Sequence, residues 1–166
     1  FLKVSSNAKI LDCGCGGGAN IKKLLKKYPH SIVNGIDYSI VSVEKSKKVN
    51  NKAVAEGRCT VLKGNVMNMP YSATCFDAVT AFETIYFWQD LPKCFCEIYR
   101  VLKPGGTFLI CNEVSGDEAK DEKWTKIIEG MTIYKDTELK KYLGQATFRN
   151  IQIRKKNNWL CVTAEK

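Results

Sequence analysis

The stretch AKILDCGCGGGAN (residues 8–20) joins a short apolar run, AKILD, to a glycine-rich turn that contains Gly14, Gly16 and Gly18. A glycine-rich turn between a strand and a helix presents backbone N–H groups and a helix N-terminus to a ligand. Glycines also let the ligand approach the main chain closely, because no side chain intervenes. The stretch therefore predicts a first strand, a ligand-binding turn and a helix.

On its own, this turn fits two kinds of ligand site. Gly14, Gly16 and Gly18 form the pattern G-x-G-x-G, but Gly14, Gly16 and Ala19 also form G-x-G-x-x-A, which matches the dinucleotide-binding fingerprint. That fingerprint requires an acid about 20 residues later, and Asp37 ends the run SIVNGID. A carboxylate at this point is able to accept hydrogen bonds from two ribose hydroxyls. Asp37 therefore suits both a nicotinamide dinucleotide and another ligand that contains a nucleoside.

Asp12 distinguishes a nicotinamide dinucleotide from another nucleoside-containing ligand. It lies at the end of the first predicted strand, two residues before Gly14. A carboxylate there repels a pyrophosphate, but it attracts a ligand that carries an amino group or a sulfonium. Asp12 therefore argues against a nicotinamide dinucleotide.

Outward from the turn, strand-like runs alternate with helix-like runs, which is typical of a parallel sheet with helices on both faces. The last two strand-like runs are separated only by Asn157 and Asn158, which is hairpin spacing. The sequence thus predicts an α/β fold, a Rossmann-like three-layer αβα sandwich whose seven-stranded, mostly parallel sheet closes with a C-terminal antiparallel hairpin. The predicted strands are residues 8–12, 31–37, 59–64, 76–83, 107–113, 149–156 and 159–165.

Helices are predicted between these strands from apolar spacing and from capping signals. The helix after the glycine turn ends at Pro29, and a lysine-rich helix continues to Gly57, a plausible C-terminal cap. A third helix precedes the run Pro104–Gly106, and two short helices are expected near residues 124–129 and 137–145. Two buried faces follow from helical spacing, one of Ile21, Leu24, Leu25 and Tyr28 and one of Leu91, Phe95, Ile98 and Leu102.

The chain of 166 residues predicts one domain, residues 1–166. No apolar run approaches the roughly 20 residues that a membrane span needs. The net charge of +9 is compatible with a nucleic-acid partner, but the lysines are spread along helical faces, as on solvated helices. Because the chain begins at Phe1 rather than at Met, we expect that an N-terminal capping segment is lacking. The sequence says nothing about oligomeric state.

Eight cysteines occur without a secretory signal, which predicts reduced thiols in a cytoplasmic protein. The close pairs Cys13/Cys15 and Cys94/Cys96 have C-x-C spacing. Cys94 and Cys96 fall in a predicted helix, where residues two apart point to nearly opposite sides and do not form one chelating face. The one histidine, His30, follows a helix end. We therefore expect no metal site, and we interpret Cys13 and Cys15 as packing residues.

Taken together, five stretches resemble the class I S-adenosylmethionine-dependent methyltransferases, in particular the type 11, ubiquinone/menaquinone-biosynthesis-like branch that acts on small molecules. They are ILDCGCGGG, GIDYS, GNVMNMPY, FDAVTAFETIYFW and EIYRVLKPGGTFLICNE, in the order and spacing of that family over residues 9–113. The resemblance implies S-adenosyl-L-methionine as cofactor and S-adenosyl-L-homocysteine as product.

The resemblance also implies roles for single residues. Gly14 and Gly16 would pass the methionine end of the cofactor, and Asp12 would lie near its amino group, directly or through a water. Asp37 would hold the ribose, and Tyr38 would pack against the adenine. Gly18 completes the cofactor-binding loop.

The later motifs supply the other predicted cofactor contacts. Asn65 stands where the family usually has an acid that contacts the adenine amino group, and an amide oxygen is still able to accept that hydrogen bond, without charge. The backbone of Val66 would meet the adenine edge. Phe82 and Glu83 would flank the methionine moiety and the transferring methyl.

The leading hypothesis is an enzyme that moves a methyl group from S-adenosylmethionine to a small organic acceptor by in-line displacement. Alternatives are an RNA or protein methyltransferase, a nicotinamide-dependent dehydrogenase and a binding module without turnover. Tyr86, Phe87 and Trp88 form either an apolar substrate wall or packing beneath the next helix. No catalytic base is assigned, although Glu83 and Tyr86 are candidates.

Overall fold

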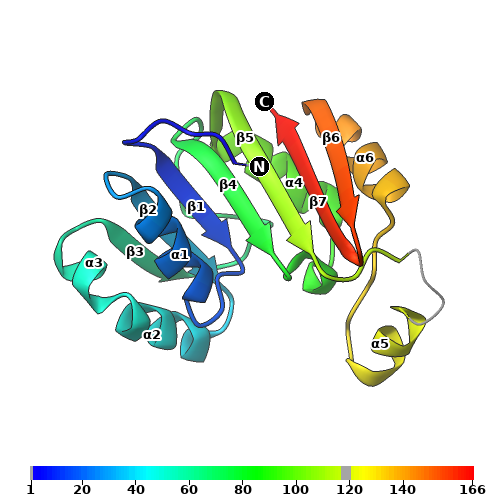
Figure 1. The fold of residues 1–166 in the computed structure, drawn as a ribbon, viewed down its shortest axis with the longest axis horizontal. Helices are drawn as coiled ribbons and strands as arrows, with labels where there is room; N and C mark the ends of the chain where they lie inside the picture. Colours follow the sequence, from blue (N-terminus) through cyan, green and yellow to red (C-terminus); the bar gives the residue numbers. More distant parts are fainter. Residues whose placement is uncertain (1, 117–120) are drawn as a thin grey trace.

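The computed structural model describes residues 2–116 and 121–166, and it contains the predicted seven-stranded sheet in the order β3-β2-β1-β4-β5-β7-β6 (Figure 1). Every pairing is parallel except β5–β7 and β6–β7. The strands are β1 (Lys9–Cys13), β2 (Ile32–Asp37), β3 (Cys59–Lys63), β4 (Phe76–Phe82), β5 (Leu102–Asn112), β6 (Arg149–Lys156) and β7 (Trp159–Glu165).

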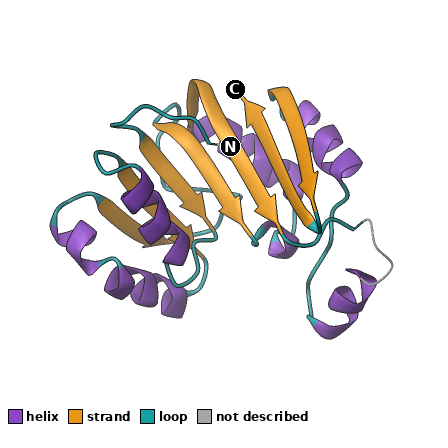
Figure 2. Cartoon of the chain, viewed as in Figure 1, coloured by secondary structure: helices purple, strands orange, loops and turns teal. Residues whose placement is uncertain are grey.

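Helices lie on both faces of the sheet, as the three-layer prediction requires (Figure 2). One face carries α1 (Ala19–Lys27), α2 (Ile40–Val49) and α3 (Asn51–Ala55) over β1, β2 and β3, and the other carries α4 (Leu91–Val101) and α6 (Asp136–Gln145). Each face has its own apolar core. The short 3₁₀ helix η1 (Ile85–Phe87) and helix α5 (Glu122–Ile127) complete the described elements.

Helix α4 follows directly from its sequence. Its N-cap, Asp90, accepts a hydrogen bond from the Lys93 backbone N–H at 3.0 Å, which satisfies one free donor of the first turn. Leu91, Phe95 and Ile98 are fully buried, which confirms three members of the predicted face, whereas the fourth, Leu102, lies beyond the helix as the buried first residue of β5. The first helix is likewise confirmed, since Ile21, Leu24 and Leu25 are buried.

The lysine-rich helix differs from its prediction. Instead of one helix up to Gly57, the structure has α2 and α3, with Asn50 between them at φ −110° and ψ 23°. The Asn50 Nδ2 donates to the carbonyl oxygens of Gly18 (3.0 Å) and Ser46 (2.9 Å). This side chain therefore fixes the break in the helix to the glycine turn, a long-range contact that local spacing does not reveal.

The fifth strand also begins earlier than predicted, at Leu102 instead of Thr107. Its pairing with β4 passes from Phe76↔Leu102 to Ala78↔Thr107, so the intervening turn with Gly105 in the left-handed region bulges out of the ladder. Of the polar run at 114–123, residues 117–120 lie outside the described residues.

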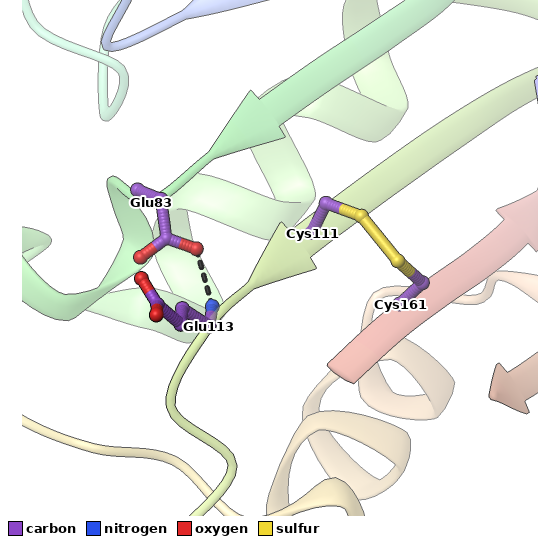
Figure 3. Close-up of a disulfide and its surroundings, with 4 residues drawn as sticks. All are labelled: Glu83, Cys111, Glu113 and Cys161. Carbon is purple, nitrogen blue, oxygen red and sulfur yellow. Dashed lines mark hydrogen bonds between the residues drawn. A yellow bond between two sulfur atoms is a disulfide. The ribbon is translucent and has the colours of Figure 1, made fainter. Parts of the chain in front are cut away.

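The predicted C-terminal hairpin is confirmed, and it carries a disulfide. Strands β6 and β7 are antiparallel with a two-residue connection, and β7 also pairs with β5. Cys111 of β5 and Cys161 of β7 are paired in register with Cα atoms 4.4 Å apart, and their sulfurs are bonded (Figure 3). The expectation that all eight thiols are reduced is therefore wrong for this pair. The expectation came from the lack of a secretory signal, and nothing in the sequence indicated this pairing, because the two residues are 50 positions apart.

The strand order sets the position of the site. Strand β1 lies between β2 and β4, so the chain continues outward in opposite directions from the β1–β4 pair. In open α/β sheets, ligands bind outside the carboxyl ends of the strands at such a switch point. Across the described residues, no helix is long and apolar enough to cross a bilayer.

Candidate functional site

A cavity of about 670 Å³ lies at this carboxyl edge of the sheet. Loops that follow β1, β2, β3 and β4 supply most of its lining, and Gly130 contributes from the segment after α5. The lining residues are Gly14, Asp37, Tyr38, Ser39, Ser42, Gly64, Asn65, Val66, Met67, Thr84, Phe87, Trp88, Gln89, Cys94 and Gly130.

The glycine turn is held against the end of β2. The backbone N–H groups of Gly14 and Cys15 both donate to the Ile36 carbonyl oxygen, at 2.8 and 3.1 Å. Gly14 has φ +67°, and a Cβ atom built on it would overlap Thr84 Oγ1 and lie 2.7 Å from Thr84 Cβ. Glycine is therefore required at position 14 both by its backbone conformation and by the side chain packed on it.

Asp37 organises the turn through its carboxylate. Its Oδ2 accepts from the Gly16 N–H and its Oδ1 accepts from the Ser39 N–H, both at 2.9 Å. Each carboxylate oxygen has further lone pairs, so it is still able to accept from a ligand hydroxyl. Asp37 lines the cavity, as expected of a ribose-binding residue.

Asp12 is buried beneath the turn with one oxygen satisfied. Thr80 Oγ1 donates to its Oδ1 at 2.8 Å, while Oδ2 has no partner. Burial raises the pKa of Asp12 from 3.8 to about 7, against the lowering effect of the Thr80 hydrogen bond, and the nearby Asp37 carboxylate raises it further. A buried, unpartnered carboxylate oxygen is suited to a cationic ligand group.

The raised pKa of Asp12 links stability to pH. Between about 3.8 and 7 the folded protein keeps a proton that the unfolded chain has released. The unfolded state then binds fewer protons, so the free energy of unfolding falls as pH rises through this window. A ligand cation that pairs with the ionised carboxylate offsets this loss.

Tyr38, Asn65 and Val66 lie together on the β2–β3 side of the cavity, as the adenine prediction requires. Tyr38 is 77% exposed, so its ring is free to pack against a flat ligand. The Asn65 Oδ1 already accepts from the Met67 N–H at 2.9 Å. The amide oxygen proposed for the adenine amino group is therefore held in place by the loop, with its second lone pair remaining.

The end of β4 is fixed to the end of β5. The Glu83 N–H donates to the Cys111 carbonyl oxygen at 3.0 Å, and Glu83 Oε1 accepts from the Glu113 N–H (Figure 3). The Tyr86 hydroxyl donates to the other Glu83 oxygen at 3.4 Å and accepts from the Val114 N–H at 3.0 Å. Glu83 adopts φ +55°, a left-handed conformation that costs a non-glycine residue of order 1–3 kcal/mol and persists only when its surroundings enforce it.

These contacts bear on both candidate bases. Desolvation raises the pKa of Glu83, against the lowering effect of the Glu113 N–H bond. Burial likewise raises the pKa of Tyr86, so its phenol stays protonated near neutrality and acts as a hydrogen-bond donor. Both side chains are occupied in joining β4 to the segment after β5.

Of the three aromatic residues considered as a substrate wall, Phe87 and Trp88 line the cavity. Tyr86 is buried behind them, and its ring lies edge-on to Phe87. The buried Cys13 contacts Met69 through its sulfur at 3.9 Å, and burial raises the pKa of Cys15 to about 12, in keeping with packing roles for both.

The cavity brings together half of the predicted cofactor residues, namely Gly14, Asp37, Tyr38, Asn65 and Val66. The other five predicted residues lie just outside its lining. Asp12 is buried beneath the turn, and Gly16 is part of the turn, with its N–H bonded to Asp37. Gly18 is the N-cap of α1 and packs against Ser46 and Asn50, Phe82 packs against the α1-side core, and Glu83 bonds the Glu113 N–H.

Several lining residues were not predicted from the sequence. Ser39 and Ser42 form the N-terminal cap of α2, and an N-cap signal directly after Asp37 was available to find them. Thr84 follows Glu83 directly, but its contact with Gly14 depends on the left-handed turn at Glu83, which carries no sequence signal. Among the described residues, no group of three or more His, Cys, Asp and Glu is arranged to hold a metal ion.

A family profile described as a methyltransferase domain matches residues 11–110. The chain is 37% identical over 109 residues to cycloartenol-C-24-methyltransferase 1 of Oryza sativa subsp. japonica, covering 66% of this chain and 31% of that protein. It is 33% identical over 121 residues to sterol 24-C-methyltransferase of Debaryomyces hansenii, covering 73% and 32%. The chain thus spans about a third of the length of these relatives.

Among solved structures, the chain superposes on geranyl diphosphate C-methyltransferase from Streptomyces coelicolor A3(2) with a TM-score of 0.84. The superposition covers 98% of this chain and 74% of that one at 14% sequence identity. That crystal structure contains S-adenosyl-L-homocysteine. At this identity the similarity is one of fold.

Proposed function

Because the chain belongs to the class I S-adenosylmethionine-dependent methyltransferases, with their methyltransferase domain over residues 11–110, we propose that it methylates a small, apolar, sterol-like acceptor. The observation that carries this proposal is the cavity at the β1–β4 switch point, where Gly14 and Asp37 lie together. The names of the relatives support the acceptor class, since both act on sterols or related compounds.

The side chains in and beneath the cavity fit the cofactor. Asp37 would accept from the ribose hydroxyls and Tyr38 would pack on the adenine, both in the lining of the cavity. The unpartnered Asp12 Oδ2 is buried beneath the turn, outside that lining, and would attract the positive charge of the methionine end directly or through a water. When bound, S-adenosylmethionine supplies an electrophilic methyl group on a sulfonium. The bare backbone at Gly14 admits this end of the ligand close to the turn.

The protein's part in the reaction is to position the two reactants. Holding donor and acceptor in line replaces a bimolecular encounter and supplies much of the reduction in the barrier. Phe87 and Trp88 would present apolar surface to the acceptor and exclude water. Since Glu83 and Tyr86 are already hydrogen-bonded to the segment after β5, we assign them positioning roles and no proton transfer.

The proposal is tested by calorimetry with S-adenosylhomocysteine and by transfer of a labelled methyl group to cycloartenol dispersed in detergent. We expect saturable binding in the micromolar range and label in the sterol fraction. Phosphoethanolamine and total RNA serve as matched alternative acceptors. Label in RNA alone would replace the small-molecule proposal, and absence of cofactor binding would reject the cofactor site.

Asp12 makes the affinity for S-adenosylhomocysteine depend on pH. Its pKa of about 7 means that the carboxyl is mostly protonated at pH 6 and mostly ionised at pH 8, and only the ionised form attracts the ligand amino group. We expect affinity to rise about ten-fold over this range, because at pH 6 binding must displace the Asp12 proton, whereas at pH 8 most molecules have already lost it. Calorimetry at both pH values measures it, and Asp12→Asn should remove the slope. A slope that survives in Asp12→Asn would assign it to another group.

A further inference from the structure

We propose that the Cys111–Cys161 disulfide is a reducible site whose redox state sets how tightly the neighbouring cavity binds the cofactor. The proposal rests on the function proposed above. It starts from the position of the bond, which joins the carboxyl end of β5 to the beginning of β7 beside the end of β4 (Figure 3).

The bond is accessible to small reductants. Leu160 and Val162 point into the core beneath α4 and α6, so Cys161 between them points to the opposite face of the sheet. Within the described residues, no helix covers β5, β7 and β6 on that face (Figure 1). Cys161 is buried, with 9% of its surface exposed, whereas Cys111 is half-buried, so a small reductant reaches the bond at Cys111.

A dithiol reduces the Cys111–Cys161 bond by thiol–disulfide exchange, and no other reactant is needed. A reductant thiolate attacks Sγ of Cys111, the more exposed residue, and the S–S bond breaks to release the Cys161 thiolate. The second reductant thiol then attacks the mixed disulfide, forming the reductant's own disulfide and releasing Cys111. Two electrons and two protons pass to the cysteine pair. Arg154 is paired with Cys161 in register, and a neighbouring cation favours a leaving thiolate.

The bonded strand end in turn holds the end of β4. The Cys111 carbonyl oxygen accepts from the Glu83 N–H, and two residues further on the Glu113 N–H donates to the Glu83 carboxylate. The Val114 N–H donates to the Tyr86 hydroxyl at 3.0 Å. Three hydrogen bonds between the two segments therefore depend on the position of the carboxyl end of β5.

Glu83 connects the end of β5 to the cavity. Its left-handed conformation, φ +55°, turns the chain so that Thr84 packs directly on Gly14 and lines the cavity. A strained conformation persists only while the surrounding contacts enforce it. Reduction removes the covalent bond between β5 and β7, so the end of β5 becomes freer to fray and the Glu83 turn is less firmly held.

The test compares air-oxidised protein with protein reduced by dithiothreitol and kept anaerobic. Alkylation and intact mass verify six free thiols in the first and eight in the second. We expect reduction to weaken S-adenosylhomocysteine binding about ten-fold, which is within the usual range of coupling between two sites. Cys161→Ser should bind S-adenosylhomocysteine as weakly as the reduced protein does, and dithiothreitol should not change its affinity. Cys96→Ser, an exposed cysteine on α4, is the matched control and should respond like the unmodified protein.

Hydrogen exchange at the Glu113 and Val114 amides provides a readout that does not need the cofactor, and both should exchange faster after reduction. Equal affinity and equal exchange in verified oxidised and reduced protein would overturn the proposal, as would eight free thiols in air-oxidised protein. If neither form binds S-adenosylhomocysteine but exchange still responds, the cofactor proposal fails while the redox-sensitive contact stands.

Discussion

Asp37→Ala is expected to weaken S-adenosylhomocysteine binding by at least about 100-fold. A hydrogen bond to a charged group contributes about 1.5–3 kcal/mol, and in the proposed site the carboxylate would accept two from the ribose. The same substitution removes the acceptors of the Gly16 and Ser39 N–H groups, so the turn loses its anchor as well. Isothermal calorimetry measures the affinity.

The control for Asp37→Ala separates binding from folding. Asp37→Asn keeps one acceptor oxygen for a backbone N–H, so we expect it to fold and to bind about ten-fold more weakly, for the loss of charge. Glu44→Ala removes an exposed acid of α2 whose partner is Lys47, and it should leave binding unchanged. Unaltered affinity in Asp37→Ala with an intact melting transition would show that the cofactor, if it binds, lies elsewhere.

Gly14→Ala is expected to abolish measurable cofactor binding, a loss of at least about 100-fold. Alanine in a left-handed conformation costs of order 1–2 kcal/mol, and its Cβ would overlap Thr84 Oγ1. Either the turn or the Thr84 segment must shift, and both line the cavity. Calorimetry measures the affinity, and thermal unfolding measures the accompanying loss of stability.

Two comparisons distinguish overlap from conformational strain. Gly16 is also left-handed, at φ +51°, but a Cβ there meets nothing within 4 Å, so Gly16→Ala should carry the conformational cost alone. Combining Gly14→Ala with Thr84→Gly removes the overlapping side chain and should recover part of the affinity. Equal losses in Gly14→Ala and Gly16→Ala, without recovery in the double variant, would contradict a role for the Thr84 contact.

Much of the fold followed from patterns that are local in the sequence. The spacing of Leu91, Phe95 and Ile98 defined α4, because a helix buries residues at that spacing. The two-residue Asn157–Asn158 connection defined the hairpin. Alternation of strands and helices defined a parallel sheet, and its carboxyl edge placed Gly14 and Asp37 together.

The predictions that failed were those that depend on contacts between distant residues. Asn50 ends α2 by bonding the Gly18 carbonyl, 32 positions away, and nothing in the lysine-rich run indicates it. Cys111 and Cys161 are adjacent only because β7 inserts beside β5 in one register. A shift of one residue in that register would turn one cysteine to the other face.

By itself, therefore, the sequence determined the fold class, the seven strands and most of the helices along the chain, and the glycine turn after β1 as the predicted ligand site, since propensity and periodicity act over a few residues. Only the tertiary structure decided that Asp12 is buried against Thr80 and that Thr84 packs on Gly14. It also decided that the Glu83 carboxylate accepts a hydrogen bond from the segment after β5. The physical reason is that burial, pKa and strain depend on the whole surroundings of a group. Those surroundings come from segments far apart in the sequence, 68 positions for the Asp12–Thr80 pair and 30 for the Glu83–Glu113 pair, and they exist only once the sheet has formed.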